Sequence, residues 1–273
     1  NHSSLVSLRE KFLKRRTVAL GMTGFVPKHV LCIGNTQYLT TEFINETFPE
    51  SKVTVVGNTE LGSADKIKLF RIRKPSIKAI FETYEFDLIV YFSGDLTYHT
   101  TEKNDSEELR EVLKYSKELQ KGTKIIFLSS LDSSFSRKTS HAILSAAKEN
   151  LCKFYASDSS LDIKIVQIPY FYSGTYKKDF LYKMFDKIHS HKTVVIEEQP
   201  QDTMHFLCLR DLSKLLSRLI DNWKSGSGIL TVVDDFGHRF SDLRDKLLAL
   251  KQGAKVDFSG QGTHNEVAAN NKA

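Results

Sequence analysis

The sequence is short of several residue types, and each shortage excludes a class of protein. Its three cysteines in 273 residues are too few and too widely spaced for a disulfide framework, so we expect a reducing, cytoplasmic compartment. Glycine is scarce, because only 14 of the 273 residues are glycine, which is below the roughly 7% of an average protein. No hydrophobic run approaches the roughly 20 apolar residues of a membrane-spanning helix. A disulfide-rich secreted domain and a membrane-spanning protein are therefore not expected.

What is present indicates an ordinary globular protein. Hydrophobic residues make up 40% of the chain and charged residues 26%, a balance that can bury enough apolar surface to offset the entropy of ordering. The net charge is +6, but the basic residues are spread among acidic ones, and Arg9–Arg16 is the one compact basic cluster. We interpret that cluster as a linker helix and do not expect a nucleic-acid partner. The absence of an initial Met suggests a piece of a longer protein with neighbouring domains.

Strand-like and helix-like patterns alternate from about residue 28 onward. Nearly continuous apolar strands separated by helices are typical of a parallel sheet covered on both faces. We therefore predict an α/β fold with a doubly wound, Rossmann-like sheet. The predicted strands are Val30–Ile33, Lys52–Val56, Lys68–Ile72, Leu88–Phe92, Lys124–Leu128 and Ile163–Ile168, and the predicted helices are Tyr38–Phe48, Ser76–Tyr84, Ser106–Leu119 and Thr139–Tyr155.

The pattern changes near residue 170 to shorter, mixed elements. These are predicted at Phe180–His189, Thr193–Ile196, Asp211–Trp223, Gly228–Val233 and Ser241–Leu250. We divide the chain into an N-terminal basic helix or linker (1–27), a Rossmann-like domain (28–170) and a smaller C-terminal mixed α/β lobe (171–273). In such folds ligands bind at the carboxyl ends of the strands, here between the two lobes.

The order of these landmarks resembles the extended short-chain dehydrogenase/reductase family, the NAD-dependent epimerases and dehydratases of nucleotide sugars. The likeness covers residues 28 to 273. It is carried by His29–Thr40 (HVLCIGNTQYLT), Phe86–Gly94 (FDLIVYFSG), Ile125–Ser130 (IIFLSS), Lys148, Val166–Gly174 (VQIPYFYSG), Met204–Leu212 (MHFLCLRDL) and Val267–Ala273 (VAANNKA). The resemblance implies a Rossmann-like fold, NAD(P) as cofactor and a nucleotide or nucleotide sugar as ligand.

The cofactor loop departs from the family pattern. Of the three glycines that the family's first loop uses, the sequence keeps Gly34, whereas Gln37 and Thr40 occupy the second and third positions. The acidic residue that ends the family's second strand and holds the ribose is replaced by Asn58 after Gly57. The residues that the resemblance places against a cofactor are Gly34, Asn35, Gln37, Tyr38, Asn58, Phe92, Ser93 and Gly94.

The catalytic pattern is also incomplete. The family uses a Ser or Thr, a Tyr and a Lys, with the tyrosine as proton donor or acceptor and the lysine ammonium lowering its pKa. Ser130 falls at the serine position and Lys148 at the lysine position, but Leu144 stands where the tyrosine belongs. The plainer interpretations are a strand-end cap for Ser130 and a solvated helix lysine for Lys148. Tyr98, Tyr170 and Tyr172 could lie near the cleft, but no spacing ties them to Lys148.

The histidines suggest no metal site. His189 and His191 are two residues apart, a spacing that fits neither one helix face nor a zinc motif. His205 and Cys208 form one H-x-x-C pair without a second pair to complete a zinc site.

Three functional hypotheses follow. The first is a catalytically degenerate epimerase/dehydratase-like domain that serves as a ligand-binding, regulatory or protein-interaction module within a larger intracellular protein. The second is an atypical NAD(P)-dependent nucleotide-sugar epimerase, dehydratase or reductase that uses another acid. The third is a basic scaffold that binds nucleic acid.

Overall fold

The computed structural model describes residues 24–57, 61, 65–70, 76–93, 106–120, 122–134, 140–157, 161–173, 179–196, 198–233 and 237–259. Two of the expected cofactor contacts, Asn58 and Gly94, lie outside these residues. So do the basic cluster Arg9–Arg16, Tyr98 and the segment Val267–Ala273.

A seven-stranded sheet forms the centre of the molecule, with strand order β11-β6-β5-β4-β1-β2-β3. All of its neighbouring strands pair in parallel. The strands are β1 (His29–Gly34), β2 (Lys52–Val56), β3 (Ile67–Phe70), β4 (Leu88–Phe92), β5 (Lys124–Ser130), β6 (Asp162–Ile168) and β11 (Gly228–Thr231). The order reverses between β1 and β4, which is the switch point where ligands bind in doubly wound folds. The predicted Rossmann-like α/β fold is confirmed.

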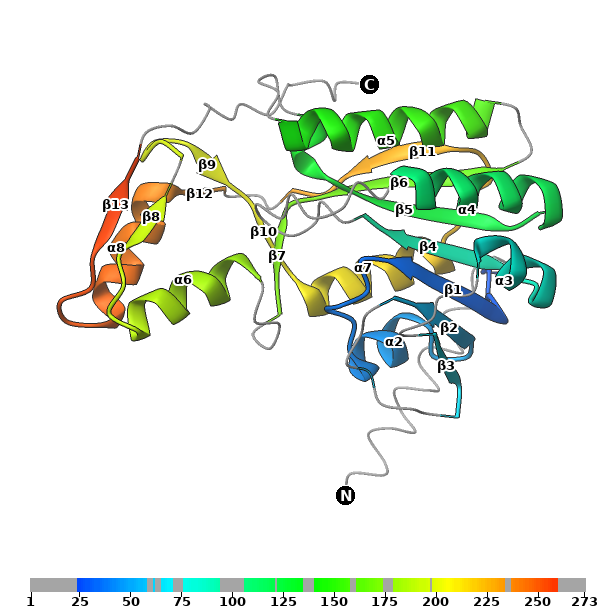
Figure 1. Ribbon diagram of the computed structural model, residues 1–273, viewed down its shortest axis with the longest axis horizontal. Helices are drawn as coiled ribbons and strands as arrows, with labels where there is room; N and C mark the ends of the chain where they lie inside the picture. Colours follow the sequence, from blue (N-terminus) through cyan, green and yellow to red (C-terminus); the bar gives the residue numbers. More distant parts are fainter. Residues whose placement is uncertain are drawn as a thin grey trace.

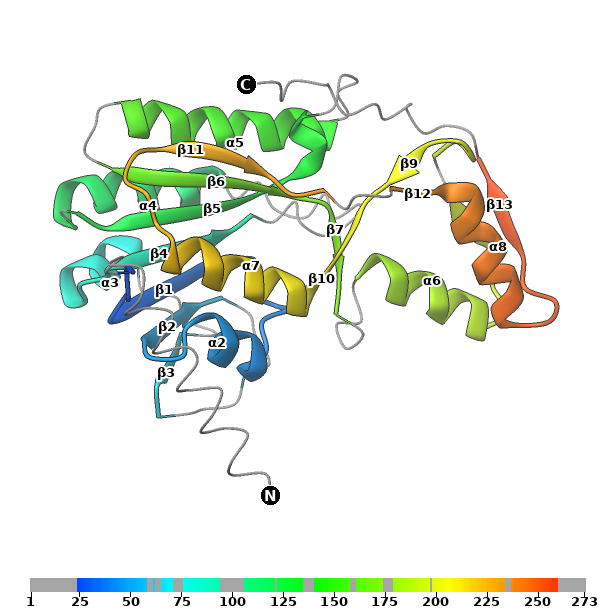
Figure 2. The ribbon, with the colours of Figure 1, turned by 180° about the vertical axis from the view of Figure 1, so that it is seen from behind.

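Helices cover both faces of this sheet (Figures 1 and 2). The helices α3 (Ile77–Thr83), α4 (Ser106–Leu119) and α5 (Ser140–Ser157) cover one face, and α2 (Thr41–Thr47) and α7 (Leu209–Asp221) cover the other. Alternate strand residues supply the two cores, as in β4, where Val90 joins the α2/α7 core and Tyr91 joins the α3/α4/α5 core. This two-sided burial explains why the strands read as continuous apolar runs.

A smaller lobe lies beside the carboxyl ends of the strands (Figure 1). It contains α6 (Phe180–His189), β8 (Val194–Ile196), β9 (Thr203–Met204), β12 (His238–Arg239), α8 (Phe240–Leu250) and β13 (Val256–Phe258). These elements share a third core, built around Phe180, Met184 and Phe240. A two-stranded parallel ribbon, β7 (Tyr170–Tyr172) with β10 (Phe206–Cys208), joins the lobe to the sheet.

The chain returns from the smaller lobe to the large sheet. Strand β11 pairs with β6 as the edge strand of the seven, and Leu212 and Leu216 of α7 belong to the core under that sheet. The boundary predicted at residue 170 places both β11 and α7 in the smaller lobe. Their pairing and packing with the large sheet correct that placement. The smaller lobe is therefore made of two separate stretches of chain.

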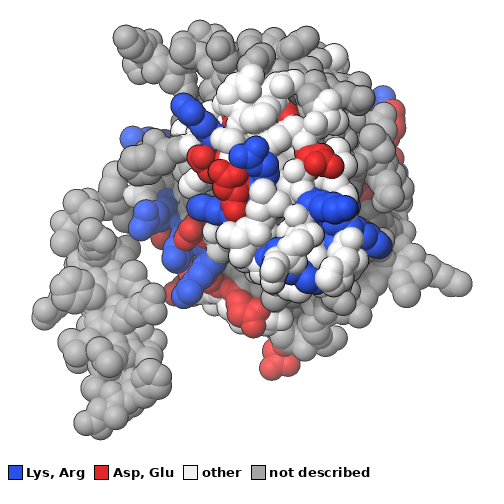
Figure 3. Space-filling model, turned by 90° about the vertical axis from the view of Figure 1, so that its left-hand side faces the viewer, with Lys and Arg blue, Asp and Glu red and all other residues white. Residues whose placement is uncertain are grey.

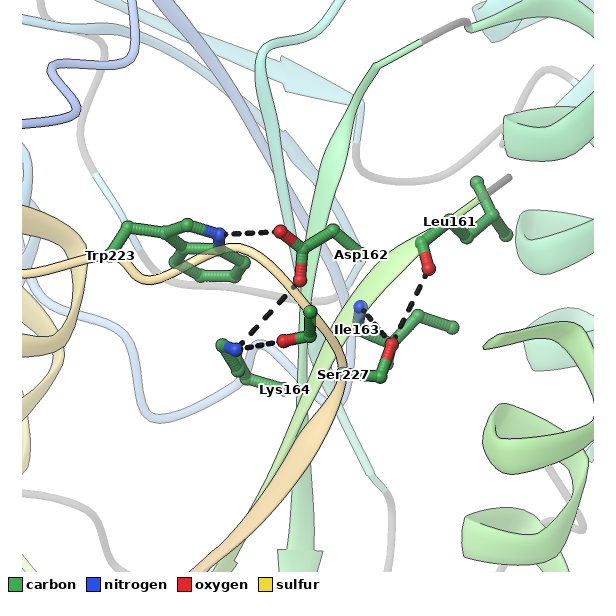
Figure 4. A network of polar contacts seen from close by, with 7 residues as sticks. Leu161, Asp162, Ile163, Lys164, Trp223 and Ser227 are labelled. Atoms are coloured by element: carbon green, nitrogen blue, oxygen red, sulfur yellow. Dashed lines mark hydrogen bonds and ion pairs between the residues drawn. The ribbon is translucent and has the colours of Figure 1, made fainter. Parts of the chain in front are cut away.

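A polar network fixes the start of β11 at the amino-terminal edge of the sheet (Figure 4). The Trp223 indole Nε1 donates to Asp162 Oδ2 at 2.8 Å. The Lys164 ammonium donates to the carbonyl of Gly226, and the Ile163 N–H donates to Ser227 Oγ at 3.1 Å. The turn between α7 and β11 is thus held against the first residues of β6.

Among the described residues, no helix combines the length and apolarity needed to cross a membrane.

Candidate functional site

The first loop begins at a glycine that no other residue could replace without movement. Gly34 has φ of +97°, and a Cβ at this position would lie 2.3 Å from the carbonyl oxygen of Phe92. The next residue uses the same oxygen, because the Asn35 N–H donates to Phe92 O at 2.7 Å. The loop is therefore drawn tightly against the end of β4. Gly34 keeps the turn geometry that the sequence resemblance implied.

A second close approach joins this loop to the end of β2. Gly57 has φ of +148°, and a Cβ there would lie 2.3 Å from Thr36 Oγ1. Thr36 is fully buried, and its hydroxyl oxygen has no hydrogen-bond partner among the residues that the structure describes. The absence of side chains at Gly34 and Gly57 thus lets the first loop pack directly on the ends of β4 and β2.

The rest of the loop belongs to the core and to the start of α2. Tyr38 is buried, with its ring centroid 4.3 Å from that of Phe171 and 5.8 Å from that of Phe92. Its side chain, like that of Phe92, is a core group, so these two expected cofactor contacts could be made only by backbone atoms. Thr40 Oγ1 accepts a hydrogen bond from the Phe43 N–H and so caps α2. The helix begins at Thr41, three residues later than predicted.

Lys148 lies inside the protein and reaches the end of β4. It is 1% exposed, and its Nζ donates to Ser93 Oγ at 3.2 Å. Ser93 is itself buried. The interpretation of Lys148 as a solvated helix lysine is wrong. The structure thus brings together two of the expected site residues, one from α5 and one that directly follows β4.

Leu144 occupies the helical turn before Lys148 and is half-buried. Leucine has no group that can exchange a proton, so Leu144 cannot act as a general acid or base. Ser130 lies at the end of β5, and its Oγ accepts a hydrogen bond from the Asp132 N–H at 3.2 Å. That bond is the local cap expected of a serine at a strand end.

A buried carboxylate beside Lys148 was missed in the sequence. Glu149 Oε1 accepts hydrogen bonds from Ser129 Oγ at 2.7 Å and Ser133 Oγ at 2.5 Å. The Gln167 amide donates to both carboxylate oxygens, at 3.0 and 3.1 Å, and Gln167 Oε1 accepts from Thr231 Oγ1 at 2.8 Å. This network ties α5 to the ends of β5, β6 and β11, and it positions the short helix Leu131–Ser134 that follows Ser130. Glu149 carries no motif that would mark it in the sequence.

The ribbon of β7 and β10 presents an aromatic face between the lobes. Tyr170 pairs with Phe206 and Tyr172 with Cys208, so these four side chains share one face of the ribbon and are half-buried. Phe171 and Leu207 take the opposite face and pack into the core of the large sheet. On this face the rings of Tyr170 and Phe206 pack against Phe180 of the smaller lobe, with centroids 5.6 and 6.0 Å from that of Phe180.

Two hydroxyls on this aromatic face have acidic neighbours. Tyr170 Oη lies 3.4 Å from Asp132 Oδ2, two residues after Ser130. Burial, followed by the neighbouring Cys208 and Asp211, raises the pKa of Tyr172. Tyr172 therefore remains a neutral hydroxyl that donates hydrogen bonds across the neutral pH range.

The loop does not fit the pyrophosphate of a dinucleotide in the usual way. That contact needs small residues at the second and third loop positions and free N–H groups at the helix start. Here Gln37 and Thr40 carry side chains, and the Thr40 hydroxyl already accepts the Phe43 N–H. Gly34 and Lys148 are the parts of the pattern that fit. In the described residues, no group of three or more His, Cys, Asp or Glu side chains could hold a metal ion.

Comparison with known proteins gives the fold. No family model matches the chain, and no curated protein matches it. The solved structure of MoeE5 with UDP-glucuronic acid and NAD is 12% identical, with a TM-score of 0.67 over 88% of this chain and 87% of that one. UDP-glucuronic acid 4-epimerase from Bacillus cereus, with UDP-glucuronic acid and NAD, is 13% identical, with a TM-score of 0.67 over 84% and 85%.

UDP-glucose 4-epimerase from Thermotoga maritima, with UDP-glucose, is 11% identical, with a TM-score of 0.66 over 86% of this chain and 87% of that one. At such identities the likeness shows the fold alone. The chain thus has the Rossmann-like fold found in nucleotide-sugar epimerases.

Proposed function

We propose that this chain is a catalytically degenerate relative of the nucleotide-sugar epimerases, one that binds a nucleotide or nucleotide sugar as a ligand-binding or regulatory module. The observation that carries the proposal is the pairing of a buried Lys148 with Leu144 one turn earlier on α5. Leu144 at that position has no hydroxyl that could give or take a proton in the way the tyrosine of the epimerase family does. General acid–base catalysis contributes about 10²–10⁴-fold to a rate, so its loss leaves binding as the main activity.

The junction between the lobes supports a ligand with a planar ring. The ribbon lies beside the carboxyl ends of the strands, and its Tyr172 is half-buried on the same face as Tyr170 and Phe206, whose rings also pack on Phe180. Base stacking on aromatic side chains is worth roughly 1–3 kcal/mol per base. The same junction contains the hydroxyls of Tyr170 and Tyr172, which can bond a sugar or a base edge.

Calorimetric titration tests binding. The ligands are UDP, UDP-glucose, UDP-glucuronic acid, NAD⁺ and NADH, and the variants are Phe206→Ala and a control, Phe185→Ala. Phe185 is an exposed aromatic residue of α6 outside the face. We expect a uridine ligand to bind, and Phe206→Ala to weaken it about tenfold while Phe185→Ala leaves it unchanged. Silence across all five ligands, or equal loss in both variants, would refute the ligand assignment.

Turnover tests the absence of hydride chemistry. We expect no epimerisation of UDP-glucose or UDP-glucuronic acid, and no change in NADH absorbance, with the natural chain. The variant Leu144→Tyr places a phenol one helical turn before Lys148, and its turnover is compared with that of the natural chain. Turnover by the natural chain that Lys148→Ala abolishes would overturn the degenerate assignment.

A second candidate is an atypical enzyme that uses another acid. The 3.4 Å approach of Tyr170 Oη to Asp132 Oδ2 favours it, because Asp132 follows Ser130 closely and a phenol is thereby present near the serine position. The variant Tyr170→Phe removes that hydroxyl while keeping the ring. Loss of a measured turnover in this variant, with UDP-sugar binding retained, would support the second candidate over the first.

A further inference from the structure

Two turns far apart in the sequence form one basic surface at the end of the smaller lobe. The turn after α6 and the turn after α8 are joined by Lys251, whose Nζ donates to the carbonyl of His189 at 2.9 Å across 62 residues of sequence. The same Nζ lies 2.9 Å from His191 Nε2. The Val194 N–H donates to the Lys255 carbonyl at 3.0 Å, so the two turns are held in a fixed arrangement.

We call this surface the basic tip. It consists of Lys187, His189, His191, Lys192, Lys251 and Lys255. Apart from the half-buried Lys251, these side chains are exposed. None of the four lysines takes part in an ion pair within the described residues.

The charge at this end of the lobe is strongly positive. Residues 183–196 and 244–258 together contain seven Lys and Arg against three Asp. Of the three acids, Asp245 is bonded to Arg244 at 2.6 Å, while Asp186 and Asp257 are exposed. Figure 3 looks onto this end, where several Lys and Arg side chains lie around an uncharged area and Asp and Glu side chains lie beside some of them. The balance of seven against three gives +4 of the chain's formal net charge of +6.

We propose that the basic tip binds the phosphate backbone of a nucleic acid. Its charged groups are lysines, which act as point charges, and closely spaced phosphates release counterions when lysines neutralise them. Lysine is depleted at protein–protein interfaces, which argues against an acidic protein as the partner. The tip lies on the smaller lobe, away from the large sheet and its first loop (Figure 1), so this surface is independent of the proposed ligand site.

The test is fluorescence anisotropy of a labelled 20-nucleotide single strand with the whole chain. The tip variant is Lys187→Gln, Lys192→Gln, Lys251→Gln and Lys255→Gln combined. The control removes the same charge from exposed lysines of the other lobe, as Lys52→Gln, Lys114→Gln, Lys153→Gln and Lys224→Gln combined. Because Lys251 joins the two turns, a third variant keeps it and changes only the other three lysines of the tip.

With the tip variant we expect affinity to fall at least tenfold at 50 mM salt and the slope of log K against log salt to decrease by about 3, since each phosphate contact on a single strand contributes about 0.7. The control should lose less than threefold. The variant that keeps Lys251 should lose affinity in proportion to its three charges. Equal loss in the tip variant and the control, no binding at 50 mM salt, or tighter binding to vesicles of anionic phospholipid than to the strand would each overturn the proposal.

Discussion

At the scale of the residue, Gly34 shows how one missing side chain shapes the candidate site. Its φ of +97° is costly for other residues, and a Cβ would meet the Phe92 carbonyl at 2.3 Å. We expect Gly34→Ala to lower the free energy of unfolding by about 2–4 kcal/mol, from the left-handed backbone and the clash together. Urea denaturation measures this change.

Gly226 provides the matched control for that substitution. Its φ of +101° is nearly the same, but a Cβ there meets nothing within 4 Å. Gly226→Ala should therefore cost only the backbone part, about 1–2 kcal/mol. Equal losses at the two glycines would show that the approach to Phe92 is not what fixes Gly34.

His29 connects a single residue to the pH dependence of stability. Burial lowers the pKa of His29 from its ordinary value of 6.5, and its ring packs against Phe86 with centroids 4.6 Å apart. The unfolded chain therefore binds a proton more readily, so the stabilisation is present above about pH 6.5 and is lost as the pH falls through the lower, folded value.

We expect His29→Gln to reduce the decline in the free energy of unfolding between pH 7.5 and pH 5. Denaturation at a series of pH values measures it, and His189→Gln, at an exposed histidine, is the comparison. An unchanged decline in His29→Gln would contradict the assignment.

At the scale of the element, the helices show what periodicity can and cannot locate. Both Ser106–Leu119 and Phe180–His189 begin and end where the pattern predicted, because an apolar stripe and polar flanks define them locally. The helix predicted at Tyr38–Phe48 begins only at Thr41. Residues 38–40, which continue the helix-like pattern in the sequence, instead form the end of the first loop, and the side chains of Tyr38 and Leu39 are buried in the core.

The contact between β6 and the turn that leads into β11 can be weakened by a single substitution. Trp223→Phe keeps the ring but removes the indole donor to Asp162 Oδ2 (Figure 4). Leaving that carboxylate without its donor should cost about 1–3 kcal/mol. Hydrogen exchange followed by mass spectrometry should show faster exchange in Gly228–Thr231 than in the natural chain.

The double variant Trp223→Phe with Asp162→Asn completes a thermodynamic cycle for this contact. If the two groups interact, the double variant should be less destabilised than the sum of the single variants. Additive losses, or unchanged exchange in β11, would mean that the network does not hold the strand.

At the scale of the whole molecule, the return of the chain to the sheet decides what can be removed. A variant that ends at Ser173 loses α7, whose Leu212 and Leu216 are fully buried, and leaves β6 as an uncovered edge. Each of these leucines contributes roughly 1.5–3 kcal/mol on burial. We expect this variant to lose cooperative unfolding in urea, followed by circular dichroism.

A variant that ends at Val233 is the comparison. It keeps α7 and β11 and removes only elements of the smaller lobe. We expect it to unfold cooperatively, and its single Trp223 supplies a fluorescence signal for the transition. Cooperative unfolding of the Ser173 variant would show that residues 28–170 fold without the returning segment.

The sequence by itself determined six of the seven strands, because two-sided burial makes each of these parallel strands a continuous apolar run that needs no knowledge of its neighbours. Only the tertiary structure showed that the seventh strand, β11, belongs to the same sheet. Through the family resemblance, it also marked Gly34, Ser130, Leu144 and Lys148 as positions of a candidate site. The tertiary structure decided what these residues contact. Only folding could show that Lys148 is buried against Ser93 and that Glu149 collects donors from three elements. Likewise, only folding joins Lys251 to His189. Burial and long-range hydrogen bonds depend on segments that are distant in the sequence, so no local pattern contains them.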